Sequence, residues 1–276
     1  MIIGISGKKQ SGKDTVAKII QGFDIWKRNL ALQTEYPLSN VFVRAYVLNR
    51  VSIYVSSWEV KKFASTLKEI VSILTGFTVE ELEKEEIKNT NLFPSYRLIN
   101  KGINTVEVFS SMEDLVERLN HLRSVYLEIY SEKELDALFE QETVYITPRL
   151  LLQTIGTDIV RTIHPDIWVN SLMNDYISYA DAFMEREDLY LKEEPNNLIY
   201  PSWCITDVRF PNEVKAIKEK EGIIIRINRE SDYNSTHFSE IALDDYEDFD
   251  YTIDNNNCID CLIEKVKEIL KHEKII

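Results

Sequence analysis

A glycine-rich segment near the start of the sequence has the residue types and spacing of a phosphate-binding site. Gly7 and Gly12 stand five residues apart and Lys13 follows directly, which gives the pattern G-x-x-x-x-G-K. Glycines let successive backbone N–H groups turn toward one anion, and a helix N-terminus adds partial positive charge. The lysine of this pattern reaches the β- and γ-phosphates of a nucleoside triphosphate. The sequence therefore predicts a P-loop whose candidate ATP-binding residues are Gly7, Lys9, Ser11, Gly12, Lys13, Asp14 and Thr15.

The residues on either side of this segment support the same interpretation. Residues 2–6 form a short apolar run typical of a central parallel strand. Val16, Ile19 and Ile20 recur at helical spacing, so a helix is expected from about Lys13. A glycine turn with a surface lysine is the simpler alternative, but a strand before the loop and a helix after it favour the P-loop.

The two residues after Lys13 bear on metal binding. Many P-loops have serine or threonine directly after the lysine, whereas this chain has Asp14 there and Thr15 next. Mg²⁺ binds oxygen ligands and is often held by one or two carboxylates together with substrate phosphates. We therefore expect Mg²⁺ with ATP, and both Asp14 and Thr15 are candidate metal ligands.

A second group of candidate residues follows another apolar run. Asp207 and Arg209 come directly after residues 203–206, which are expected to form a buried strand. Ligands of open α/β sheets bind at the carboxyl ends of the strands. Arg209 is therefore a candidate clamp for an acceptor phosphate or the migrating phosphoryl group, with Asp207 orienting it or holding metal-bound water. The alternative is a surface salt bridge at the start of a helix.

Polar side chains recur every four residues after Thr147-Pro148. A proline at the first helical position favours a helix here, and His164-Pro165 is expected to end it. The stripe consists of Arg149, Gln153, Thr157 and Arg161. It is either part of a site or simply a solvated helix face. Twelve residues of unbroken helix span about 18 Å, so Arg149 and Arg161 cannot both hold one phosphate there.

Along the chain, strands and helices are expected to alternate outside residues 92–146. This order predicts an α/β fold with a doubly wound parallel sheet. The expected strands are residues 2–6, 60–64, 203–206, 223–227 and 249–253, and the later helices include one capped by Asn212 and one over 259–270. We expect a single P-loop domain over residues 1–276.

Two segments do not fit the alternation and are expected to be insertions. Residues 31–57 contain runs rich in valine and isoleucine, which predict extended structure and a hairpin. Residues 92–110 also look extended, and Ser111 and Ser131 carry helix-start signals. The insertion at 92–146, with Arg97 and Arg123, is a candidate lid that would keep water away from a reacting phosphate.

Composition limits the partners of the chain. The formal net charge of −14 over 276 residues argues against a nucleic-acid polymer, because such binding relies on lysine and arginine neutralising phosphates. No apolar run approaches the length of a membrane span, and the first residues lack the basic region of a signal peptide. The sequence leaves a homodimer open. Residues 185–197 are polar and are expected to form an exposed loop.

Cysteine usage indicates a reducing compartment. The chain has 3 cysteines, too few for a disulfide scaffold, and a cytoplasmic location fits best. Cys258-x-x-Cys261 has the spacing of a redox or half-zinc motif. Because no second pair accompanies it, the sequence favours a purely structural role for these cysteines.

Several motifs together resemble one family. The loop Ser6-Gly7-x-Lys9-x-Ser11-Gly12-Lys13-Asp14-Thr15 resembles the P-loop of deoxynucleoside monophosphate kinases encoded by tailed bacteriophages. Similar segments follow in the same order: Phe63-Ala64-x-x-Leu67-Lys68, Arg149-x-Leu151-x-Gln153-x-x-Gly156-Thr157-Asp158, Asp207-x-Arg209-x-x-Asn212-Glu213 and Thr236-His237-x-Ser239-Glu240. Residues 31–57 and 92–146 match poorly.

The resemblance implies a P-loop kinase fold and in-line transfer of a phosphoryl group from ATP to a nucleoside monophosphate, in the host cytoplasm if a phage encodes the chain. It implies catalytic roles for Lys13, Arg209, Asp207 and Arg149. It also implies acceptor-binding roles for Lys68, Lys88, Arg149, Gln153, Gly156, Thr157, Trp168, Asp207, Arg209 and Glu213. From composition alone, Trp168 is more often a core residue than a platform for a base.

Three other functions remain open from the sequence. A kinase of another small molecule, such as phosphomevalonate or dephospho-coenzyme A, would keep the P-loop with a different acceptor. A GTPase would carry an Asn-Lys-x-Asp motif, which the sequence lacks, and an ATPase motor would carry an acidic pair where Asp207 precedes Val208-Arg209. A non-enzymatic sensor would bind ATP without any acceptor raising turnover.

Overall fold

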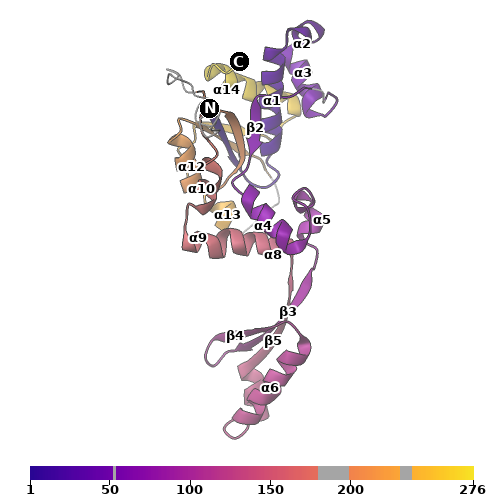
Figure 1. The fold of residues 1–276 in the computed structure, drawn as a ribbon, viewed down its shortest axis with the longest axis vertical. Coiled ribbons are helices and arrows are strands. Elements are labelled where there is room, and N and C mark those ends of the chain that lie inside the picture. Colours follow the sequence, from indigo (N-terminus) through magenta and orange to yellow (C-terminus); the bar gives the residue numbers. More distant parts are fainter. Residues whose placement is uncertain (52–53, 180–198, 231–237) are drawn as a thin grey trace, which may run out of the picture. The chain divides into compact units, whose positions relative to one another are not determined.

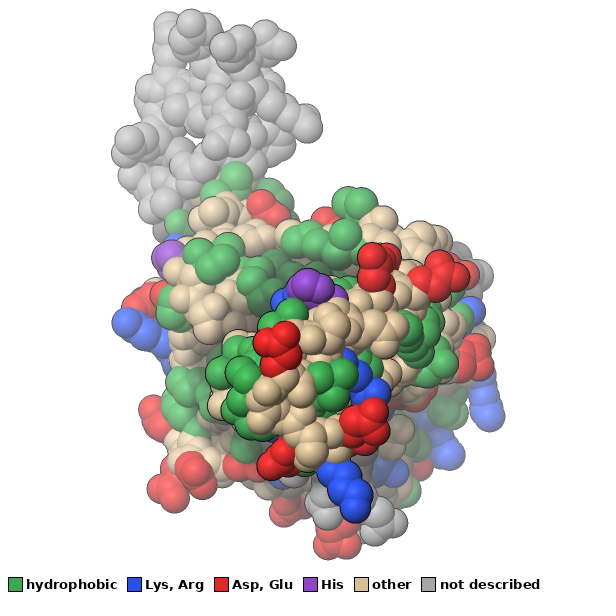
Figure 2. Space-filling model, turned by 90° about the horizontal axis from the view of Figure 1, so that it is seen from below, with side chains coloured by type: hydrophobic (Ala, Val, Ile, Leu, Met, Phe, Trp, Pro, Cys, Tyr) green, Lys and Arg blue, Asp and Glu red, His purple; other side chains and the backbone are tan. Residues whose placement is uncertain are grey.

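The computed structural model describes residues 1–51, 54–179, 199–230 and 238–276. These residues form two compact units, Met1–Thr66 with Val160–Ile276 (unit 1) and Leu67–Ile159 (unit 2). Figure 1 shows the ribbon of both units, and Figure 2 shows acidic and basic side chains interspersed with apolar ones on the face it presents. The predicted loop at 185–197 and the residues Thr236 and His237 lie outside the described residues.

Unit 1 is built on a five-stranded sheet in which every strand pair is parallel. The strands in spatial order are β2 (Trp58–Lys61), β6 (Ser202–Val208), β1 (Ile2–Gly7), β7 (Ile223–Asn228) and β8 (Tyr251–Asp254). The chain runs from central β1 out to the edge at β2, returns beside β1 as β6, and then adds β7 and β8 on the other side. The order therefore reverses beside β1, which is where open α/β sheets bind ligands.

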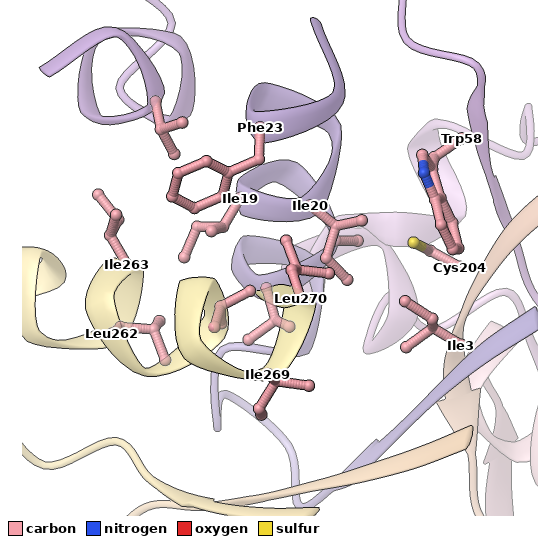
Figure 3. Close-up of a cluster of buried hydrophobic side chains, with 14 of the residues drawn as sticks. Ile3, Ile19, Ile20, Phe23, Trp58, Cys204, Leu262, Ile263, Ile269 and Leu270 are labelled. Carbon is pink, nitrogen blue, oxygen red and sulfur yellow. The ribbon is translucent and has the colours of Figure 1, made fainter. Parts of the chain in front are cut away.

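Helices cover both faces of this sheet, so its central strands are apolar on both sides. On one face Ile3 and Ile5 of β1 pack with side chains of α1 (Lys13–Arg28), α3 (Ser39–Val47) and α14 (Ile259–His272). Figure 3 shows α1 and α14 meeting in this cluster. On the other face Ile2 packs with side chains of α10 (Ile167–Met173) and α12 (Pro211–Lys218). The predicted doubly wound parallel sheet is confirmed.

The prediction of extended structure is wrong for residues 31–47, and the predicted run at 51–55 lies partly outside the described residues. This segment forms α2 (Leu30–Glu35) and then α3, and Asn29 caps α2 by accepting hydrogen bonds from the N–H groups of Ala31 and Leu32 at 3.1 and 3.3 Å. Phe42 and Val43 are buried against α1 on one face of α3. Tertiary packing of that face outweighs the β-propensity of the valines.

Three boundaries differ from those expected. The strand expected over 60–64 is β2, which ends at Lys61 because the N–H groups of Phe63 and Ala64 bond a side chain and not a neighbouring strand. Helix α12 begins at Pro211, so Asn212 is inside it and does not cap it. The strand expected over 249–253 is β8, and α14 extends to His272.

Unit 2 contains a small antiparallel sheet with its own core. Its strands, in spatial order, are β4 (Thr105–Phe109), β3 (Phe93–Asn100) and β5 (Phe139–Ile146), and the helices beside them are α6 (Met112–Tyr126) and α7 (Glu132–Leu138). The core consists of Leu98, Leu115, Leu119, Leu135 and Phe139. The predicted helix starts at Ser111 and Ser131 are confirmed, since each precedes a helix and takes part in a side-chain cap.

The remaining elements of unit 2 are mostly helical. They are α4 (Ser65–Thr75), which begins in unit 1, η1 (Glu81–Glu83), α5 (Glu85–Lys88), α8 (Pro148–Gln153) and η2 (Thr154–Ile159). Thr147 caps α8, as expected. However, the single helix expected after Thr147 is interrupted, because η2 is a π-helix. The chain then continues in unit 1 as α9 (Val160–Ile163). The short helix α13 (Phe238–Ile241) comes between β7 and β8 in the sequence.

Candidate active site

The loop between β1 and α1 has the backbone geometry that a phosphate cradle needs. Gly7 has φ of 154° and Gly12 has φ of 104°, both in the region that side chains rarely adopt. A Cβ atom on Gly7 would stand 2.5 Å from Ser11 Oγ, and one on Gly12 would stand 2.6 Å from Asn255 Nδ2. Only glycine fits at either position, so the loop keeps the tight turn predicted from the sequence.

Lys13 folds back over this loop. Its ammonium group donates hydrogen bonds to the carbonyl oxygens of Gly7 at 2.8 Å and Lys8 at 2.7 Å. Burial, with the positive charge of Arg209 as the second cause, lowers the pKa of Lys13 to about 8. Two cations therefore share one poorly solvated region, and an anion bound between them would relieve their repulsion.

Ser11 presents a polar atom without a protein partner. Its hydroxyl oxygen is buried and has no hydrogen bond within the part of the chain that the structure describes. The backbone oxygen of Ser11 accepts a hydrogen bond from Asn255 Nδ2 at 2.8 Å, which fixes the loop to the segment after β8. A buried hydroxyl without a partner costs free energy, so this position is suited to a phosphate oxygen.

The two candidate metal ligands lie in the first turn of α1. The Asp14 side chain is exposed and its Oδ1 stands 3.9 Å from Lys62 Nζ, while Thr15 is partly buried. Among the described residues no cluster of three or more histidine, cysteine or acidic side chains is arranged to hold a metal. Such a site fits Mg²⁺ bound largely through substrate phosphates with one or two protein oxygens.

Asp207, at the end of β6, anchors the chain that follows β2. Its Oδ1 accepts a hydrogen bond from the Phe63 N–H at 2.8 Å, and its Oδ2 accepts one from the Ala64 N–H at 3.0 Å. Its negative charge also raises the pKa of Lys13 against the larger effect of burial. Asp207 therefore acts on the site electrostatically and also fixes the start of the segment that contains Lys68.

Arg209 is held by a carboxylate beside the P-loop. Its Nη1 donates to Glu240 Oε1 at 2.5 Å, and its backbone N–H donates to Glu213 Oε2 at 2.7 Å. The charges of Arg209 and Glu240 both act on the pKa of Lys13. The structure thus brings together Lys13, Asp14, Asp207 and Arg209, as the sequence predicted, and adds Glu240.

Glu213 is buried and fully engaged by the protein. Besides the Arg209 N–H, its Oε2 accepts the Phe210 N–H at 3.1 Å, and its Oε1 lies 2.6 Å from Arg161 Nη2. Burial raises the pKa of Glu213 to about 7, and the charge of Asp207 adds to this rise. Arg161 also lies over the Phe210 ring at 3.7 Å. This geometry favours Glu213 as a positioning residue for Arg209 over direct contact with a nucleotide.

Sequence reasoning passed over three residues around the loop. Lys8 Nζ lies 2.9 Å from Asp244 Oδ2, and Arg226 Nη2 lies 3.2 Å from Asp244 Oδ1. Arg226 Nη1 also donates to Ser6 Oγ at 3.1 Å, because β1 and β7 pair Ser6 with Arg226. Arg226 could have been noticed in the sequence, because it is an arginine within the otherwise apolar run 223–227.

The other predicted acceptor-binding residues occupy unit 2, with one exception. Arg149 Nε donates to Asn89 Oδ1 at 2.9 Å and its Nη2 contacts Glu85, while Lys68 lies 2.5 Å from Glu83. Lys88 Nζ lies 3.8 Å from the same Glu83 carboxylate. Gln153 ends α8, and Gly156 and Thr157 lie in the π-helix. Trp168 lies in unit 1, buried in α10.

Gly156 has a steric reason to be glycine. It is buried, and a Cβ atom there would stand 2.5 Å from Leu67 Cδ2. Single π-turns inside helices are rare and often occur at functional sites. The break also separates the two arginines of the stripe: Arg149 pairs within unit 2, and Arg161 pairs within unit 1.

A P-loop at the switch point of a parallel sheet, with an arginine held beside its lysine, defines the class of P-loop phosphotransferases. Comparison with known proteins gives the family. The model of the deoxynucleotide monophosphate kinase family matches residues 1–266, and the chain belongs to this family.

Two relatives agree with this assignment. The chain is 27% identical over 230 residues to the deoxynucleoside-5'-monophosphate kinase of Escherichia phage T5, which covers 79% of this chain and 72% of the relative. It is 31% identical over 136 residues to a provisionally named deoxynucleotide monophosphate kinase of Acanthamoeba polyphaga mimivirus, which covers 48% of this chain and 66% of the relative. The resemblance seen in the sequence is confirmed, and the chain is a deoxynucleoside monophosphate kinase.

Proposed function

We propose that the chain transfers the γ-phosphoryl group of ATP, bound with Mg²⁺, directly to the phosphate of a deoxynucleoside monophosphate. The observation that carries this proposal is the pairing of Lys13 with Arg209. Lys13 is partly buried at the P-loop, and its pKa is lowered to about 8 by this burial and by the charge of Arg209. Two cations beside a loop of backbone N–H groups suit a reaction in which two anions must approach each other.

The reaction needs positioning and charge neutralisation more than covalent chemistry. In the proposed step an oxygen of the acceptor phosphate attacks the γ-phosphorus, the bond from that phosphorus to the β–γ bridging oxygen breaks, and ADP leaves. Lys13 exchanges its two carbonyl partners for phosphate oxygens, and Arg209 neutralises the acceptor phosphate. When bound, Mg²⁺ would add positive charge at the β- and γ-phosphates, held by Asp14 and Thr15.

By family resemblance, the residues proposed to bind the acceptor nucleotide are Arg149, Lys68, Lys88, Gln153, Gly156, Thr157 and Trp168. Residues 92–146 are proposed to form a lid that excludes water, so that the phosphoryl group passes to the acceptor and not to water.

The proposed partners of the chain are small-molecule nucleotides, and its proposed location is the cytoplasm. Residues 1–276 are proposed to form one kinase domain. The net charge of −14 opposes binding of a nucleic-acid polymer, and Figure 2 shows basic side chains scattered among acidic ones on the face it presents. Within the described ranges no helix is long and apolar enough to cross a membrane.

The experiment is ADP release from Mg²⁺·ATP by the purified chain, alone and with each common deoxynucleoside and ribonucleoside monophosphate. We expect one or more deoxynucleotides to stimulate release strongly. Lys13→Ala is expected to lower stimulated turnover by about 10²-fold or more, by analogy with loss of one transition-state donor.

Lys18→Ala is the matched control, since Lys18 lies on the same helix and its Nζ donates to Asn49 Oδ1 at 3.1 Å. It should keep activity close to that of the unchanged chain. Steady ADP release that no acceptor alters would contradict the proposal and favour an ATPase.

A further inference from the structure

Two cysteines meet at the start of α14, away from the residues proposed for phosphoryl transfer. Cys258 is the N-cap residue of the helix and Cys261 lies in its first turn. Both are exposed, and their sulfur atoms are 3.0 Å apart. Bonded sulfur atoms lie about 2.05 Å apart, so a small movement of the two side chains brings them within bonding distance.

The two thiols are not equivalent. The hydrogen bond from the Cys261 thiol, followed by the Cys261 N–H, lowers the pKa of Cys258. The same thiol–thiol bond raises the pKa of Cys261. A thiolate at a helix N-terminus is also favoured by the partial positive charge there. Cys258 is therefore the attacking sulfur and Cys261 the resolving one.

The body of α14 holds this pair in place. Leu262 and Ile263, directly after Cys261, are buried in the cluster shown in Figure 3. Because this packing fixes the helix, Cys258 and Cys261 in its first turn stay exposed to solvent. Cys204, by contrast, is completely buried in β6, and burial raises its pKa. Reaction with a soluble oxidant is thus confined to Cys258 and Cys261.

A short segment connects the pair to the phosphate loop. Asn255, three residues before Cys258, donates through Nδ2 to the Ser11 oxygen at 2.8 Å and is buried. Its own N–H donates to the Asn228 oxygen at 2.7 Å. Residues 255–258 therefore run directly from the contact with the phosphate loop to the attacking sulfur.

We propose that Cys258 and Cys261 form a reversible, redox-sensitive disulfide that restrains the phosphate loop through Asn255. With a low-molecular-weight disulfide as oxidant, the Cys258 thiolate attacks one sulfur and releases one thiolate. Cys261, after losing its proton, then attacks the Cys258 sulfur and releases the second. Two cysteine thiols are oxidised, one oxidant disulfide is reduced to two thiols, and the two protons end on those products.

A disulfide accounts for the pair better than a metal does. Zinc sites in proteins have three or four protein ligands. No cluster of three or more potential ligands occurs among the residues that the structure describes. Two neighbouring thiols of unequal pKa instead match the arrangement of a reactive dithiol.

The first test treats the full chain with oxidised glutathione, alkylates the remaining thiols and measures the intact mass. We expect the oxidised chain to have lost two hydrogen atoms and to carry two fewer alkyl groups than the reduced chain, with residues 258 and 261 joined, and we expect dithiothreitol to reverse the change. Cys204→Ser should behave in the same way, whereas Cys261→Ser should stop at a mixed disulfide on Cys258. Recovery of both thiols, or a mixed disulfide as the end product in the unchanged chain, would overturn the proposal.

The second test measures amide hydrogen exchange of residues 7–14 in the reduced and oxidised chain. Restraint through Asn255 predicts exchange slower by roughly threefold or more after oxidation. The effect should be absent in Cys261→Ser and reduced in Asn255→Ala. A disulfide that forms while loop exchange stays unchanged would overturn the coupling. Neither test requires kinase activity, so the outcome is independent of the proposed function.

Discussion

At the scale of single residues, the charges around Lys13 were easier to predict than the groups that position them. The spacing of Gly7, Gly12 and Lys13 has one common structural use, and Arg209 follows an apolar strand, so both were found. Glu213 and Arg161 form an ion pair across 52 residues of sequence. The sequence pattern placed Arg161 and Arg149 on one unbroken helix. Nothing in that local spacing indicated a contact between Arg161 and Glu213.

Glu213 gives a prediction about stability and pH. Burial raises its folded-state pKa from 4.5 to about 7, so the folded chain binds this proton more tightly than the unfolded chain does. The associated stability is present below about pH 4.5 and is lost as pH rises through about 7, an effect of at most roughly 3 kcal/mol. Glu213→Gln should therefore show a flatter dependence of unfolding free energy on pH than the unchanged chain in this window.

Urea denaturation at several pH values between 4.5 and 8 measures the difference. Glu219→Gln is the control, because Glu219 is exposed at the end of the same helix and pairs with Lys215 at 3.8 Å. It should follow the unchanged chain. Parallel curves for the unchanged chain and Glu213→Gln would show that Glu213 does not titrate in this range. Loss of turnover in Glu213→Gln with nucleotide affinity kept would support its positioning of Arg209.

At the scale of elements, the strands that carry the site were predictable and the helices added around them were not. The apolar runs at 2–6, 203–206 and 223–227 are too short for buried helices, so they predict buried strands. The structure has a strand at each of them. Residues 31–57 were assigned extended structure from valine and isoleucine, yet Phe42 and Val43 pack on α1 from a helix. Packing against α1 decides between a strand and a helix for this segment, and the local sequence pattern does not show that packing.

The loop between β1 and α1 gives a prediction at this scale. Gly12→Ala should destabilise the chain by about 1–3 kcal/mol, because alanine at φ of 104° is strained and its Cβ would stand 2.6 Å from Asn255 Nδ2. ATP binding should weaken in parallel. Gly76→Ala is the matched control: Gly76 has φ of 76° but nothing within 4 Å of a Cβ, so it carries the strain without the contact.

Denaturation and ATP titration of both variants separate the two effects. Gly76→Ala should lose about 1 kcal/mol and keep its ATP affinity. Equal loss of stability and equal ATP affinity in the two variants would show that the contact with Asn255 does not shape the loop.

At the scale of the whole molecule, the sequence order of strands and helices predicted the parallel sheet of unit 1, and the poor match of residues 92–146 marked most of unit 2. The small core around Leu98 and Leu115 was not visible in advance, because its residues come from strands and helices that meet only after folding. The assignment of acceptor residues in unit 2 rests on family resemblance. In the structure Arg149 bonds Asn89 and Glu85, and Lys68 pairs with Glu83, so these contacts by themselves point to no nucleotide.

The proposed lid gives the prediction for this scale. Phe93 and Ile146 are directly paired at the base of the antiparallel sheet, so residues 94–145 can be replaced by a two-residue glycine turn. The shortened chain should transfer phosphoryl groups more slowly, and its ratio of ATP hydrolysis to transfer should rise, because water gains access to the reacting phosphate. An unchanged transfer rate together with an unchanged ratio would remove the lid from the account.

The central claim is that the γ-phosphoryl group passes directly to a nucleoside monophosphate at the P-loop. Its most direct measurement follows a label on the γ-phosphate of ATP in the presence of the acceptor that best stimulates ADP release. The account predicts that the label appears in the nucleoside diphosphate in one-to-one proportion to ADP, and that Lys13→Ala abolishes this transfer. Label released as inorganic phosphate at the same rate with and without the acceptor would contradict it.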